Sequence, residues 1–174
     1  LLLEDGKLSF AIIHFWPGNA IRIQSRKAVP LNEWTHVAAT YDGSSQASGL
    51  NLYENGILIK PKVARDHLTR EITGGGSPFL TLGERMRDRG FKNGSMDELY
   101  LYDRKLSGSE VRTLAQLDSE PTKEDLFEIF LQSAYGPYLK QANQLKKERA
   151  AFGKARERIP EIMVMKEMPG NRAT

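Results

Sequence analysis

The acidic stretch MDELYLYD, residues 96–103, carries the side chains best suited to acid–base chemistry. Asp97 and Glu98 are adjacent, and Asp103 follows six residues after Asp97. On a strand, adjacent side chains point to opposite faces, and six residues span about 20 Å. A retaining glycosidase needs two carboxyl groups roughly 5 Å apart. The spacing argues against glycoside hydrolysis, and we expect no enzyme activity.

The histidines and glycines give no sign of a metal or phosphate site. His14, His36 and His67 lie on separate segments without the i, i+4 spacing of a helical metal site. His36 alternates with Trp34 on a predicted strand, and we expect it to be partly buried with a hydrogen-bond partner. The stretch TGGGSPF lacks the lysine and following helix of a phosphate-binding loop, so we interpret it as an inter-strand loop.

Side chains suited to ligand binding are easier to find. Trp16 lies in the turn sequence HFWPGN, which ends at Asn19. Sugar binding requires an exposed aromatic face beside polar groups, which this turn could supply. The alternative is that Trp16 covers the core of the fold. Arg85 and Arg87 belong to a cationic loop that is either solvated or in contact with an acidic glycan.

Composition excludes several classes of function. The 25 basic and 22 acidic residues give a net charge of +3, which is too small to imply a nucleic-acid partner. The chain has no cysteine, which rules out disulfides, thiolate zinc sites and covalent haem attachment. The longest apolar runs are about half a membrane span, so we expect no membrane insertion.

Alternating hydrophobicity indicates that residues 1 to about 105 form antiparallel sheets packed face to face. The pairs Asp5-Gly6 and Asn55-Gly56 indicate tight turns, and Asn55-Gly56 suits the positive φ angles of a two-residue hairpin. Small residues on both faces of residues 34–41 favour a central strand. The predicted strands are KLSFAIIHF, AIRIQSR, WTHVAATY, LNLYENGILIK, FLTLGER and MDELYLYD.

From residue 107 onward the hydrophobic period becomes helical. Ser107 with Glu110, and Thr122 with Asp125, have the spacing of capping boxes. Gly136-Pro137 should end the second helix and begin the third. Helices joined so tightly predict a hairpin whose apolar stripe packs on itself and on a sheet, with a partner-docking coiled coil as the alternative. In the third helix that stripe comprises Tyr138, Ala142, Leu145 and Phe152.

These patterns divide the chain into a sandwich over 1–118, a helical hairpin over 119–159, and residues 160–174. The last segment includes EIMVMKEMPGNRAT and is interpreted as a linker or the start of a following domain. The opening LLLEDGKLSF lacks the basic region and cleavage site of a signal peptide. We therefore expect the chain to be part of a longer one, with any targeting signal upstream.

Four motifs in order carry a family resemblance: WTHVAATYDG at 34–43, LYENG at 52–56, LTLG at 80–83 and GSMDELYLYDRKLSGSEV at 94–111. They resemble the signature of laminin-G-like domains of the concanavalin A-like lectin/glucanase superfamily. The resemblance implies a jelly-roll sandwich of two antiparallel sheets, here truncated at its N-terminus. The helical part and tail are similar to exported multidomain bacterial proteins of the planctomycete cytochrome type, with neighbouring domains in the same chain.

The resemblance also implies ligands. Laminin-G-like domains often hold calcium through oxygen ligands on loops, and Asp42 and Asp97 match signature positions. Both also suit structural roles, because Asp42 can bind its own turn amides and Asp97 can anchor a loop. No other cofactor is expected. The leading hypothesis is a non-catalytic module that recognises carbohydrate or protein; the alternatives are a structural spacer and, last, a glycan hydrolase.

Overall fold

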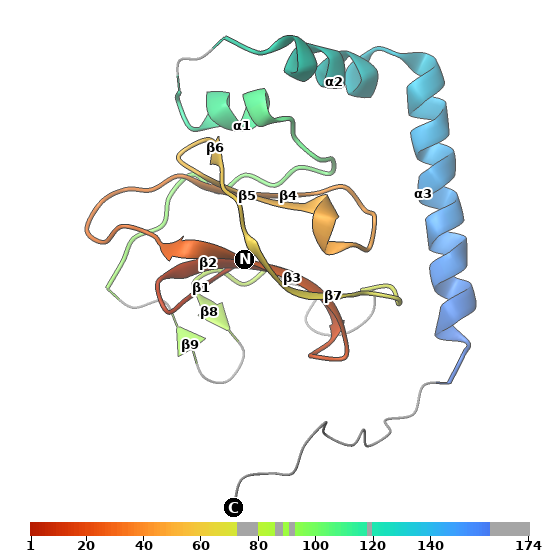
Figure 1. The fold of residues 1–174 in the computed structure, drawn as a ribbon, viewed down its shortest axis with the longest axis horizontal. Coiled ribbons are helices and arrows are strands. Elements are labelled where there is room, and N and C mark those ends of the chain that lie inside the picture. The colour runs from red at the N-terminus through yellow and green to blue at the C-terminus, as the bar shows by residue number, and fades with distance from the viewer. Residues whose placement is uncertain (73–79, 86–88, 91–92, 118–119, 161–174) are drawn as a thin grey trace, which may run out of the picture.

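Two antiparallel sheets and three α-helices make up most of the described chain (Figure 1). The computed structural model describes residues 1–72, 80–85, 89–90, 93–117 and 120–160. The predicted segment after Pro160 therefore lies outside the described residues. The strands are β1 Leu2–Glu4, β2 Lys7–Phe15, β3 Asn19–Ala28, β4 Val37–Tyr41, β5 Leu50–Glu54, β6 Ile57–Leu58, β7 Lys62–His67, β8 Glu84–Arg85 and β9 Arg89–Gly90. The helices are α1 Gly108–Leu114, α2 Lys123–Ser133 and α3 Gly136–Glu157, with a short 3₁₀ turn at Ala47–Gly49.

The two larger sheets share one apolar core. Their strand orders are β1-β2-β3-β7 and β4-β5-β6. Ile21 and Ile23 of β3 and Leu52 of β5 are at most 1% exposed, because alternate side chains of each strand face the other sheet. This confirms a β-sandwich with a helical C-terminal part, while the jelly-roll connection pattern stays a prediction. The core cluster comprises Leu8, Ile21, Ile23, Ala47, Leu50, Leu52 and Leu68.

Strand β7 carries the chain from the second sheet back to the first. It follows β6 and pairs antiparallel with β3, with Arg65 opposite Arg22 and His67 opposite Ala20. Residues directly opposite one another in an antiparallel pair lie on the same face. Arg22 and Arg65 therefore lie on the outer face of the first sheet, away from Ile21 and Ile23.

The Asn55-Gly56 hairpin is confirmed, with φ angles of 48° and 76°. The Asn55 side chain accepts a hydrogen bond from the His36 amide (2.9 Å), and the Asn55 amide donates to the His36 carbonyl (2.8 Å). These bonds close the end of the ladder, so β4 begins only at Val37. Within the described residues β4 pairs with β5 alone. The prediction that this strand is central is wrong, because β4 lies at the edge of its sheet. Strand β7, which could have covered that edge, pairs with β3 in the other sheet.

The predicted strand MDELYLYD is not a strand in the structure. Glu98 has a φ of 50°, which interrupts an extended backbone. No described strand pairs with this segment, and the four apolar residues Leu99 to Tyr102 are between 48% and 74% exposed. The predicted strand FLTLGER is much shorter in the structure: of its described residues only Glu84–Arg85 form a strand, β8. Its first residue, Phe79, lies outside the described residues.

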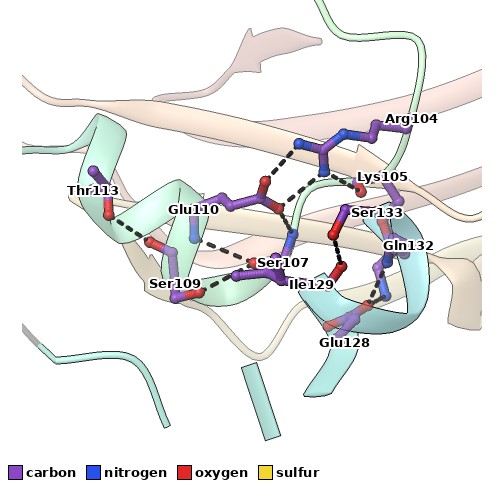
Figure 2. A network of polar contacts seen from close by, with 10 residues as sticks. All are labelled: Arg104, Lys105, Ser107, Ser109, Glu110, Thr113, Glu128, Ile129, Gln132 and Ser133. Atoms are coloured by element: carbon purple, nitrogen blue, oxygen red, sulfur yellow. Dashed lines mark hydrogen bonds and ion pairs between the residues drawn. The ribbon is translucent and has the colours of Figure 1, made fainter. Parts of the chain in front are cut away.

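Helices α1 and α2 both begin with the predicted capping boxes. The Ser107 hydroxyl accepts a hydrogen bond from the Glu110 amide, and the Thr122 hydroxyl accepts one from the Asp125 amide. Figure 2 shows how Arg104 extends the first box by donating to both carboxylate oxygens of Glu110, at 2.5 and 3.0 Å. The guanidinium of Arg104 lowers the pKa of Glu110 to about 2. This polar network fixes the entry of the chain into α1.

Helices α2 and α3 meet at a corner instead of forming the predicted hairpin (Figure 1). Their apolar side chains are largely unburied: Phe127 and Phe152 are each 62% exposed, against the expectation of a packed stripe. The polar contacts of α3 with the sandwich explain this direction, because Arg70 pairs with Glu157 and Gly153 packs on Glu71. No helix in the described ranges is long and apolar enough to cross a membrane.

The Asn55-Gly56 turn gives a test of how α1 docks on the sandwich. A Cβ at Gly56 would lie 2.8 Å from Leu117 Cδ1 and 3.2 Å from the Arg112 backbone. Because Gly56 also has a positive φ, Gly56→Val should lower the free energy of unfolding by roughly 1–3 kcal/mol. Gly136→Ala is the control, since a Cβ there meets nothing within 4 Å. Equal unfolding midpoints in urea for the two variants would contradict this docking.

The Arg104–Glu110 contact gives a test by pH. The Glu110 pKa is depressed from 4.5 to about 2, so its stabilising contribution is complete above pH 4.5 and is lost as pH falls toward 2. Arg104→Gln should raise the Glu110 pKa toward 4.5, as followed by carboxyl carbon chemical shifts in NMR. Lys105→Gln is the control, because Lys105 pairs with Glu128 instead. An unchanged Glu110 titration in Arg104→Gln would refute the contact.

Candidate functional site

Trp16 is a surface tryptophan at the turn between β2 and β3. Its side chain is 42% exposed, which favours the ligand-binding interpretation over a lid on the core. Its neighbour Phe15 is 57% exposed at the end of β2. The turn is short because Phe15 pairs directly with Asn19 in the β2–β3 ladder. The indole therefore projects from a fixed point of the first sheet.

Arg22 supports the indole of Trp16 from β3. Its guanidinium carbon lies 5.3 Å from the ring centroid, within the range of a cation–π contact. Arg22 Nε donates to the Ser9 hydroxyl at 2.8 Å, and Nη2 donates to the Glu4 carboxylate. Three strands thus hold one cation beneath the ring. We call Trp16, Arg22, Ser9 and Glu4 the Trp16 platform.

Sequence reasoning did not identify three of these four residues. Alternation along β3 already separates Arg22 from the core residues Ile21 and Ile23, and this is the signal that could have located it. Nothing in the spacing shows that Arg22 contacts Trp16. That contact depends on the register of β2 and β3, in which Arg22 lies opposite Ala11 and Asn19 lies opposite Phe15.

Asn19, predicted to bind ligand, is instead a buried residue whose side chain is hydrogen-bonded to a neighbouring segment. It is 4% exposed. Its Oδ1 accepts hydrogen bonds from the amides of Thr69 (3.0 Å) and Arg70 (3.2 Å), and its Nδ2 donates to the Thr69 hydroxyl at 2.6 Å. Both the oxygen and the nitrogen of the side-chain amide are thus hydrogen-bonded within the protein. Asn19 therefore positions the segment after β7, and its burial argues against contact with a ligand.

The two candidate metal residues hold their own loops. Asp42 Oδ1 accepts a hydrogen bond from the Ser44 amide at 2.8 Å, the structural alternative given above. Gly49 packs so closely on this carboxylate that a Cβ there would clash with it. Asp97 Oδ1 accepts from the Glu98 amide at 2.8 Å. In the described part of the chain, no group of three or more His, Asp or Glu side chains could hold a metal ion.

Asp97 also lines an open hollow of about 450 Å³ together with Glu98, the apolar residues Leu82, Met96 and Leu99, and two glycines. Both acidic residues line this hollow, and the segment that carries them is not a strand. Of the two candidate arginines, Arg85 lies in β8, and Arg87 lies outside the described residues.

His36 differs from its expected environment. It is partly buried, as predicted, but within the described chain its Nδ1 atom is buried without a hydrogen-bond partner. Burial lowers the pKa of His36. His14 Nδ1 instead lies 2.5 Å from the Glu71 carbonyl, and His67 is exposed on β7. The histidines do not converge on one site.

Comparison with known proteins gives one family match and one structural match. A laminin G family model, described as "Concanavalin A-like lectin/glucanases superfamily", matches residues 1–112. No curated protein matches the chain. The solved structure is the 2.1 Å crystal structure of an S-layer domain-containing protein (residues 221–444) from Clostridium thermocellum. It is 20% identical with a TM-score of 0.34, and the match covers 66% of this chain and 65% of that chain.

The contact between Arg22 and Trp16 is testable by fluorescence. In a Trp34→Phe background Trp16 is the sole tryptophan of the chain. Arg22→Gln should then increase quenching of Trp16 by acrylamide, because the guanidinium no longer shields the ring. Arg26→Gln is the control, since Arg26 lies on the same strand without a ring contact among the described residues. Identical quenching in the two variants would show that Arg22 does not cover the indole.

Proposed function

The chain belongs to the concanavalin A-like lectin/glucanase superfamily, and from this premise we propose that it is a non-catalytic module that binds carbohydrate at the Trp16 platform. The supporting observation is an exposed indole held in place by an anchored cation. An aromatic face packs on the apolar C–H groups of a sugar ring, and neighbouring polar groups set its orientation. A rigid platform binds with less loss of side-chain entropy than a mobile one.

The charge distribution of the platform suits a polyhydroxylated ligand. Arg22 has five N–H donors, and its bonds to Ser9 and Glu4 involve Nε and Nη2. Within the described chain Nη1 has no partner, so it is free to donate to a sugar hydroxyl. Glu4 is 26% exposed and can accept from another hydroxyl. The platform thus combines an aromatic ring with a hydrogen-bond donor and an acceptor in its neighbourhood.

This function places the parent protein outside the cytoplasm, where polysaccharides of the cell surface are accessible. The module would then tether neighbouring domains of a longer chain to a glycan. Such a role requires no bound metal, and neither Asp42 nor Asp97 takes part in it.

Substitution of the two tryptophans tests the proposal. Trp16→Ala should weaken binding to a glycan identified on an array by about tenfold, because the apolar sugar face loses its partner. Trp34→Ala is the matched control, since Trp34 is 71% exposed but lies apart from the platform in the β3–β4 connection. Dissociation constants are measured by isothermal titration calorimetry.

Three results would overturn the proposal. If both substitutions weakened glycan binding equally, the Trp16 platform would not be the binding site. A folded protein that binds no glycan on the array would be a structural spacer. Release of reducing ends from the bound glycan, abolished by Glu98→Gln, would identify a hydrolase that uses the hollow around Asp97.

A further inference from the structure

A second hollow, lined largely by charged residues, lies at the other end of β3 from the Trp16 platform. It has a volume of about 250 Å³ and is lined by Ser25, Arg26, Lys27, Glu54, Ile59 and Lys60. The first three residues belong to β3, Glu54 ends β5, and Ile59 and Lys60 follow β6. Five residues of strand separate Arg22 from Lys27, which is about 16 Å. The hollow therefore lies where the ends of the two sheets meet, apart from Trp16.

The cations of this hollow are not neutralised. Arg26, Lys27 and Lys60 are all exposed, and within the described chain none of them forms an ion pair or a side-chain hydrogen bond. Elsewhere on the protein, arginines such as Arg22 and Arg104 have carboxylate partners. Converging unpaired cations attract an anionic group.

The backbone beneath these cations is fixed. The buried Ser25 hydroxyl accepts a hydrogen bond from the Leu8 amide (3.0 Å) and donates to the Lys27 carbonyl (2.7 Å). On the opposite wall the Ile59 amide donates to the Leu52 carbonyl at 3.0 Å, immediately before Lys60. Both walls of the hollow are therefore attached to hydrogen-bonded segments of the sheets.

Glu54 identifies the chemistry of the ligand more closely. Glu54 lines the same hollow, is partly exposed, and forms no ion pair in the described chain. A ligand composed only of anionic groups would be repelled by Glu54. A sugar that bears both hydroxyl donors and an anionic group would satisfy Glu54 and the three cations together. We propose that this hollow binds an anionic sugar unit of an acidic polysaccharide, an inference that rests on the proposed glycan recognition.

A nucleic-acid ligand fits the hollow less well. Proteins that hold single strands stack bases on aromatic rings, and the lining contains none. The net charge of the chain is only +3. A neutral sugar would leave the three cations without partners. The sugar unit therefore carries either a carboxylate or a sulfate ester, which share the same contacts with Arg and Lys.

Charge reversal tests the anionic site. Arg26→Glu/Lys60→Glu should weaken binding of polygalacturonate or dextran sulfate by about tenfold or more, since two attractions become repulsions. Lys146→Glu/Lys147→Glu on α3 is the matched control, because it makes the same change in net charge at exposed residues away from the hollow. Neutral dextran and duplex DNA are titrated in parallel, and circular dichroism checks the fold.

The expected result is tighter binding of one acidic polysaccharide than of dextran, lost in the hollow variant and kept in the α3 variant. Polygalacturonate and dextran sulfate distinguish a carboxylate from a sulfate ester. Equal losses in both variants, or tighter binding of DNA, would overturn the inference. Trp16-dependent binding of neutral glycans without preference for acidic ones would overturn it while leaving the proposed function intact. Failure to bind any glycan would overturn both.

Discussion

The packing of β3 against β5 is the constraint on which the rest of the molecule depends. Ile21 and Ile23 meet Leu52 in a core where each is at most 1% exposed. Strand alternation then forces Arg22 onto the outer face. Burial of a few aliphatic side chains therefore decides which cations face solvent, and it fixes both polar sites at opposite ends of one strand.

The helices are attached to this sandwich by close backbone approaches and polar contacts. Gly56 allows the β5–β6 turn to touch the end of α1, and Gly153 allows α3 to lie against Glu71. Arg149 of α3 adds a hydrogen bond to the Asp42 carbonyl at 3.4 Å. Because these contacts join α3 to the sandwich and not to α2, the two helices diverge. Because the two helices diverge, aromatic residues such as Phe127 and Phe152 do not pack between them and stay exposed.

The two proposed sites complement one another in chemistry. The Trp16 platform offers an aromatic face with an anchored cation, and the hollow at Lys27 and Lys60 offers free cations with one carboxylate. The first suits the apolar face of a sugar ring and the second suits its charged substituent. A linear acidic polysaccharide presents both features repeatedly along its length. Rigid strands between the sites hold their separation constant.

The sequence alone determined the features that depend on neighbouring residues: the Asn55-Gly56 turn, the two capping boxes, and the alternation that separates core from surface. Their physics is short-ranged, since a turn or a cap is decided within four residues. Only the tertiary structure decided the return of β7 to β3, the burial of Asn19, the support of Trp16 by Arg22, and the absence of a strand at Met96 to Asp103. Each of these depends on which distant segment a residue or strand pairs with. The local sequence pattern does not specify that partner.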